Sequence, residues 1–289
     1  MSHHRRTATL AVALLASATA PRTQDPGAAP SATDAFAAVK KDYDKAMKDF
    51  EAIYAAAKTD EERQKTFSHY PQGETFAPRI VEIVQKWPAD PVAVEATNWL
   101  LPISSGQVKG LAELFDVLLG NQIDNPKLAD TCKAMQYNSV PKGAAFLRTV
   151  MQKSPHAEAQ GWACYVLAKQ IDSEAGLAER LQRGAGKDLV EWLTQSRGEQ
   201  EVARMKAADP EALRQEGAAL LEQVIAKYGD LKAYRKTLGE QAKGDLFELR
   251  NLAVGMVAPE IEGTDTDGVA FKLSDYRGKV LFLDFWGFW

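Results

Sequence analysis

Apolar residues recur at three- and four-residue steps along most of the chain, with charged residues between them. This spacing puts the apolar side chains on one face of a helix. The first such segment runs from Asp34 to Lys58, and no strand pattern interrupts the series over about two hundred residues. The sequence therefore predicts an all-helical domain over residues 34–253. Further helices within it are predicted over residues 76–87, 92–101, 111–119, 126–135, 143–151, 155–170 and 210–228.

Short helices in close succession favour a solenoid-like helical repeat, because no single pair can bury its own apolar face and stacking of neighbours completes the core. Residues 211–229 resemble a tetratricopeptide-type helix and residues 157–170 a HEAT-type helix, although neither defines a family. A compact, non-repeating helical bundle has the same periodicity and stays open as the alternative.

The pattern changes after Gly255. Residues 258–263 and 269–273 flank the dipeptide Asp267-Gly268, which is typical of a hairpin turn. Residues 280–283 are then apolar on both faces, as in the central strand of a parallel or mixed sheet. We therefore expect a mainly α domain followed by the opening of an α/β domain over residues 254–289.

The N-terminus has the order of a secretory signal peptide. Arg5 and Arg6 precede an apolar run over residues 8–16 and small residues suitable for cleavage after Ala18. We expect a signal peptide over residues 1–18, a disordered linker over 19–33, and an exported protein that is periplasmic or extracellular. No segment approaches the roughly 20 apolar residues of a transmembrane helix.

Composition limits the partners. The chain has 289 residues and a formal net charge of -4, to which Arg5 and Arg6 contribute two positive charges. A mildly acidic chain without a basic block does not indicate nucleic acid or anionic membrane as a partner. No cofactor motif is present, and His69 and His156 fall in different helical segments, which argues against a metal site.

Two cysteines occur, Cys132 and Cys164, both inside helical patterns. In an exported protein they could form a disulfide. The alternative is two buried thiols that behave as small apolar residues.

Several motifs follow one another between residues 257 and 289: Ala258-Pro259, Asp267-Gly268, Leu273-Ser-Asp-Tyr-Arg-Gly-Lys279 and Phe285-Trp-Gly-Phe-Trp289. In this order they resemble the start of a redoxin, specifically the thioredoxin-like thiol-disulfide oxidoreductases of the TlpA type. The resemblance covers about the last eighth of the chain. It implies a thioredoxin-like fold, of which this segment is the N-terminal fragment, and protein thiols and disulfides as substrates.

In that family, a Cys-x-x-Cys motif follows the strand. The first thiol sits at a helix start, where the helix dipole and unpaired N–H groups favour the thiolate that attacks disulfides. The printed chain stops at Trp289, one residue before that position, so we expect it to be inactive as written. Ordinary truncation and a selenocysteine encoded by a stop codon remain two explanations.

The resemblance matches Asp284 to the buried acid that accepts a proton from the second cysteine in thioredoxin. A carboxylate in an apolar strand is costly to ionise, and the alternative is that Asp284 is solvated at the edge of the fragment. Phe285, Trp286 and Trp289 would flank the active site of a complete domain; in this chain we expect the two tryptophans to be exposed or packed on the helices. The alternative function is a helical scaffold that binds a protein partner and carries a vestigial redoxin tail.

Overall fold

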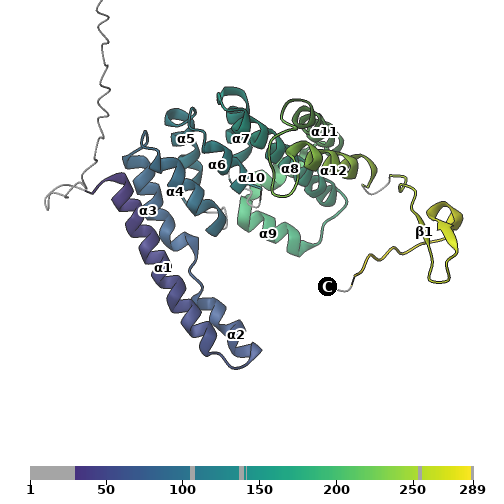
Figure 1. Cartoon of the computed structure of the whole chain (residues 1–289), viewed down its shortest axis with the longest axis horizontal. Coiled ribbons are helices and arrows are strands. Elements are labelled where there is room, and N and C mark those ends of the chain that lie inside the picture. Colours follow the sequence, from purple (N-terminus) through teal and green to yellow (C-terminus); the bar gives the residue numbers. More distant parts are fainter. Residues whose placement is uncertain (1–29, 105–107, 137–139, 141, 253–255, 288–289) are drawn as a thin grey trace, which may run out of the picture.

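The structure, a computed structural model, describes residues 30–104, 108–136, 140, 142–252 and 256–287. Within these residues the protein is mostly helical, with one small sheet near the C-terminus (Figure 1). The helices are α1 (Ala32–Ala56), α2 (Asp60–Thr66), η1 (Phe67–His69), α3 (Gly73–Lys86), α4 (Val92–Leu100), η2 (Leu101–Ile103), α5 (Leu111–Asn121), α6 (Leu128–Ala134), α7 (Gly143–Lys153), α8 (Ala157–Gln182), α9 (Lys187–Arg197), α10 (Glu199–Ala207), α11 (Pro210–Lys227), α12 (Leu238–Asn251) and η3 (Leu273–Tyr276), and the strands are β1 (Glu262–Thr264) and β2 (Ala270–Lys272).

The predicted signal peptide and most of the linker lie outside the described residues. The helix α1 begins at Ala32, two residues earlier than expected, so Ala32 and Thr33 are not linker. Ser31 explains the earlier start, because its Oγ accepts a hydrogen bond from the Asp34 backbone N–H at 3.2 Å and the Asp34 carboxylate accepts one from the Ser31 N–H at 3.3 Å. This reciprocal pair is a capping box.

The helices from α3 to α8 pack in two connected rows. The first row is α3, α5 and α7, the second is α4, α6 and α8, and each helix contacts the next one in its row. The two rows contact each other where α3 meets α4 and α7 meets α8, and α11 then packs on α8 and α12 on α11. Figure 1 shows the helices following one another across the molecule in this order. The described helices thus form a layered bundle, the alternative that the sequence left open.

One continuous hydrophobic core runs through this bundle from α1 to α12. Its centre includes Phe115 of α5 and Phe146 of α7, whose rings stack with their centroids 4.5 Å apart, and each is 1% exposed. A separate small hydrophobic cluster forms between α8, α9 and α10 and consists of Leu181, Leu193 and Met205. Both cores consist of residues from the helical part alone.

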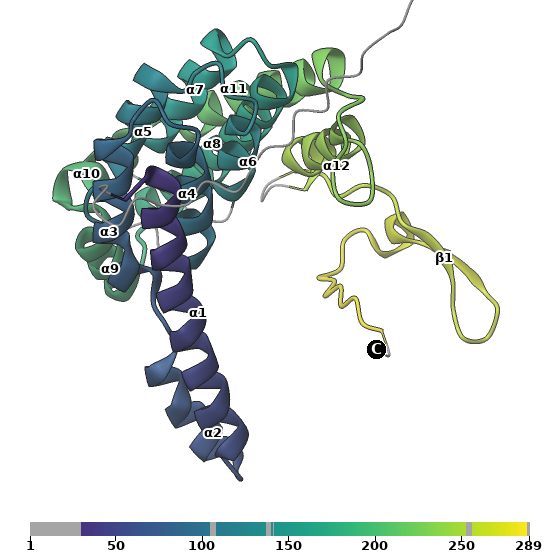
Figure 2. The same cartoon turned by 60° about the vertical axis from the view of Figure 1, so that its left-hand side comes forward.

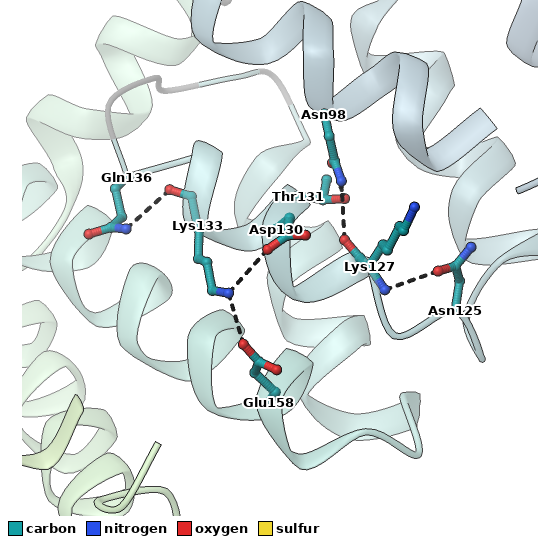
Figure 3. A network of polar contacts seen from close by, with 8 residues as sticks. All are labelled: Asn98, Asn125, Lys127, Asp130, Thr131, Lys133, Gln136 and Glu158. Carbon is teal, nitrogen blue, oxygen red and sulfur yellow. Dashed lines mark hydrogen bonds and ion pairs between the residues drawn. The ribbon is translucent and has the colours of Figure 1, made fainter. Parts of the chain in front are cut away.

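Polar contacts join the second row at its surface (Figure 3). Asn98 of α4 donates to the carbonyl of Lys127 at 3.2 Å and accepts from the Thr131 hydroxyl at 2.6 Å. The Lys133 ammonium lies between the carboxylates of Asp130, at 3.1 Å, and Glu158, at 2.8 Å. These side chains come from α4, α6 and α8 and the segment before α6, so they fix the register between neighbouring helices.

Both cysteines are free and fully buried, Cys132 in α6 and Cys164 in α8. The Cys164 thiol donates a weak hydrogen bond to the carbonyl of Leu220 in α11 at 3.4 Å. Of the two possibilities left open by the sequence, the structure has buried thiols and no disulfide between them. None of the described helices combines the length and the apolar character that crossing a membrane requires.

Candidate functional site

The C-terminal segment from residue 256 lies apart from the helical bundle, as Figures 1 and 2 both show. Its centre is the predicted hairpin. Strands β1 and β2 pair antiparallel, with Gly263 opposite Phe271 and Thr264 opposite Ala270. The expectation of a hairpin around Asp267-Gly268 is confirmed.

A single carboxylate organises the hairpin turn. The Oδ1 atom of Asp265 accepts hydrogen bonds from the backbone N–H groups of Asp267 at 3.0 Å and Val269 at 2.8 Å. Gly268 donates to the Asp265 carbonyl at 3.1 Å and has a φ of 82°, a conformation that favours glycine. The turn is therefore encoded by its own residues and needs no support from the helices.

The motifs that resemble redoxins are also joined to one another by local hydrogen bonds. The Glu260 carboxylate accepts from the Ser274 N–H at 2.9 Å, and hydrogen bonds from the Ser274 side chain first and from its backbone second hold the pKa of Glu260 below its usual range. The Asp275 carboxylate accepts from the Lys272 N–H at 2.9 Å. The hairpin and the Leu273-x-Asp275 motif, which both follow Ala258-Pro259, thus form one small unit.

The prediction of a buried central strand after residue 279 is wrong for this structure. Residues 280–287 form no strand, and Val280 is fully exposed, Phe282 91% exposed and Phe285 81% exposed. A central strand needs hydrogen-bonded neighbours on both sides and a layer over each face. Among the described residues the sheet has only β1 and β2, which pair with each other, so the expected thioredoxin-like sheet is not formed.

The predicted site residues are not brought together. Asp284 is exposed, in keeping with the alternative of a solvated carboxylate, and Trp286 is 81% exposed, one of the two states expected for it. Phe285 is likewise in solvent, and Trp289 lies outside the residues that the structure describes. Because an active site exists only where these groups face a reactive thiol, their roles stay predictions.

The two cysteines of the chain are unsuited to exchange. Burial raises the pKa of the Cys164 thiol to about 12, and burial also raises the pKa of Cys132 well above its usual range. A reactive cysteine needs the opposite, an accessible thiol that ionises readily. No cluster of three or more His, Cys, Asp or Glu side chains suited to a metal ion occurs in the described ranges.

Sequence reasoning missed one exposed feature, the turn between α11 and α12. Tyr234 at its tip is 92% exposed, and Lys232, Arg235 and Lys236 around it are exposed as well. The signal that could have found it is an aromatic residue next to two cations in the short gap between two helical patterns.

Comparison with known proteins links a short part of the chain to redox enzymes. No protein-family model matches the chain, and no solved structure does. Over 38 residues, 13% of the chain, it is 55% identical to a protein named Thiol-disulfide oxidoreductase ResA from Geobacillus kaustophilus (strain HTA426). It is 50% identical over 38 residues to the protein of the same name from Geobacillus thermodenitrificans (strain NG80-2). The match covers 22% of each of these proteins, so the chain spans about a fifth of the length of the curated relatives it matches.

Proposed function

We propose that residues 254–289 are the opening part of a thioredoxin-like domain of the TlpA type. The protein in which this domain is complete would carry out thiol-disulfide exchange on exported protein substrates. The observation that carries the proposal is the ordered series of motifs from Ala258 to Trp289, together with a similarity to ResA proteins whose length, 38 residues, is close to that of this segment.

The exposed apolar residues of the segment support this proposal. The exposed fraction is 41% for Leu281, 91% for Phe282 and 47% for Leu283, and these residues are not part of a strand. Burying one such side chain fully stabilises a protein by about 1.5–3 kcal/mol. A sheet that enclosed residues 280–286 would therefore gain several kcal/mol, which is the physical reason for a sequence to carry this run.

The chemistry requires two thiols that follow the strand. The first, as a thiolate, attacks one sulfur of a substrate disulfide, forms a mixed disulfide and releases the other substrate sulfur as a thiolate. The second thiol loses its proton and displaces the substrate, so the enzyme becomes oxidised and the substrate is reduced. Asp284 is the proposed acceptor of that second proton, a role for which it must be buried beside the second thiol.

Export is part of the proposal and rests on the N-terminal sequence. The order of Arg5 and Arg6, an apolar run and small residues is that of a signal peptide. Secretion into an oxidising compartment would give the exchange reaction its substrates, because disulfides persist there.

The test is reduction of insulin by the product of the complete reading frame, with dithiothreitol as the electron donor. We expect turbidity from precipitating insulin to develop faster with this product, and replacement of the first cysteine after Trp289 by serine to abolish the acceleration. Residues 1–289 alone serve as the matched control and should be inactive. Inactivity of the extended protein with both thiols present would refute the proposal.

A second candidate function is a protein-binding scaffold, as the sequence also allowed. It is favoured by a specific observation: the hydrophobic cores involve none of the described residues of the C-terminal segment. The helical part would then act without redox chemistry. Inactive extended protein that still captures a partner through the helices would support this candidate over the first.

A further inference from the structure

The turn between α11 and α12 is a tight, hydrogen-bonded structure. Lys232 and Thr237 form an isolated antiparallel bridge, and Ala233 N–H donates to the Lys236 carbonyl at 2.9 Å. Tyr234 and Arg235 therefore lie between these bonded positions, at the tip of the turn. This turn, residues 232–237, presents them away from the bundle.

The base of the turn is anchored on both sides. Gly239 N–H donates to the Gly229 carbonyl at 3.0 Å, and a Cβ atom on Gly239 would lie only 2.7 Å from the Cα of Gly229, so the two backbones meet at a distance that only glycine permits. Leu238 is fully buried in the core, and Thr237 caps α12. The turn is thus held in one shape without a ligand.

The tip combines an aromatic ring with positive charge. Tyr234 is 92% exposed, and the Arg235 guanidinium carbon lies 5.2 Å from the centre of its ring. Lys232, Arg235 and Lys236 form no ion pair within the part of the chain that the structure describes. On a chain with a net charge of -4, this is a local positive surface.

Two exposed carboxylates lie close in sequence, Asp230 and Glu240, and they offset part of this positive charge. Glu240 accepts the Thr237 N–H at 2.7 Å, and this bond lowers the pKa of Glu240 and commits its carboxylate to capping α12. Asp230 precedes the turn, near its base. The three exposed cations around the ring outnumber these two carboxylates.

We propose that the turn 232–237 is a docking surface for an acidic segment of another protein. Tyrosine and arginine are the residues that contribute most to protein interfaces, and a fully exposed tyrosine offers apolar area together with a hydroxyl. A preformed turn loses little conformational entropy on binding. The three cations attract an acidic partner and align it.

Nucleic acid and membrane fit this surface less well. Strong binding to a phosphate backbone depends on neutralising many phosphates, and three cations on an acidic chain neutralise few. Binding to anionic lipid is typical of clusters of four to eight basic residues beside a membrane-inserting element. The proposal does not depend on the redox function of the C-terminal segment.

The test is binding of a short fluorescein-labelled peptide rich in Glu, Asp and Leu to the full chain, measured by fluorescence polarisation at low and physiological salt. Its counterpart with Gln and Asn in place of the acids is the ligand control. The variants are Tyr234→Ala and Arg235→Glu, with Lys41→Glu as the matched control because Lys41 is an exposed cation on α1 that forms no ion pair with the residues the structure describes. All three positions are exposed, so thermal unfolding should be unchanged in each variant.

We expect Tyr234→Ala to weaken binding about fivefold and Arg235→Glu to weaken it on the order of tenfold, with less than a twofold effect of Lys41→Glu. No binding of the acidic peptide, or an equal loss in all three variants, would overturn the proposal. So would tighter binding, dependent on Tyr234, to oligothymidylate or to vesicles containing phosphatidylserine than to the peptide.

Discussion

A buried tyrosine of α8, Tyr165, is hydrogen-bonded to helix α12. These hydrogen bonds give the most specific prediction about stability. Tyr165 is 2% exposed, and its hydroxyl donates to Asp245 at 2.6 Å and accepts from Gln241 at 2.7 Å. The second oxygen of Asp245 accepts from Lys169 at 2.8 Å. Replacing Tyr165 by phenylalanine removes one hydroxyl and keeps the ring.

The expected cost follows from the groups left behind. Tyr165→Phe leaves the Gln241 amide and one oxygen of Asp245 without the hydroxyl, and hydrogen bonds to charged groups contribute about 1.5–3 kcal/mol each. The Asp245 side chain is 16% exposed, so water compensates for only a part of the loss. We expect the free energy of unfolding to fall by about 2 kcal/mol. Asp245→Ala should cost a similar amount, because the Lys169 ammonium, 37% exposed, can be hydrated instead.

The assay is urea-induced unfolding of both single variants and the double variant, followed by circular dichroism. Because the two side chains share one hydrogen bond, the double variant should be less destabilised than the sum of the single effects, by about 1 kcal/mol. Tyr234→Phe is the matched control and should have no effect, since that side chain is 92% exposed. Strict additivity, or a change below about 0.5 kcal/mol in Tyr165→Phe, would refute the reasoning.

Four further outcomes follow from the structure. Burial, and to a lesser extent the hydrogen bond to Asp245, raise the pKa of Tyr165 above its ordinary value of 10.0. The unfolded chain therefore loses this proton at a lower pH than the folded chain, so the free energy of unfolding should fall as the pH rises above 10. Urea titrations at alkaline pH should show a smaller fall for Tyr165→Phe than for the unchanged protein. Both cysteine thiols should be inert to Ellman's reagent at pH 8 in the native protein and react after denaturation in guanidinium, whereas a disulfide would yield no thiol. Phe115→Ala should cost about 3–5 kcal/mol in chemical unfolding because the ring is buried, while the control Phe282→Ala, at a 91% exposed position, should leave stability unchanged; an equal loss in both would contradict the core assignment. Brief trypsin treatment of the native protein should cut after the exposed Arg277 and leave the helical bundle intact, a result that mass spectrometry can check.

Most of the helices were predictable because their signals are local, but α2, α9, α10 and α12 were not predicted individually. Asp209 and Pro210 mark the start of α11, and the Asp209 carboxylate does accept the Glu211 N–H at 2.9 Å. The end of α8 was not predicted: the pattern indicated residue 170, and the helix continues to Gln182. Beyond Ile171 its buried residues are small, mainly Ala175 and Ala178, and alanine gives a weak amphipathic signal.

In the C-terminal segment, too, the features that depend on neighbouring residues were predictable and those that depend on distant residues were not. The Asp267-Gly268 turn and the bonds of Asp265 are made within a few residues, so the sequence alone indicated the hairpin correctly. Residues 280–283 were expected to form a strand because they are apolar on both faces, yet a strand depends on partners distant in the chain. Exposure of Val280 and Phe282 follows from the lack of such partners among the described residues.

The central proposal is that residues 254–289 open a thioredoxin-like domain, in which a redox-active motif follows the last strand of this segment. The nucleotide sequence that continues the reading frame past the Trp289 codon tests it most directly. The account predicts a cysteine codon or UGA next, followed after two codons by a second cysteine codon in the same frame. A different stop codon, or in-frame codons without this spacing, would contradict it.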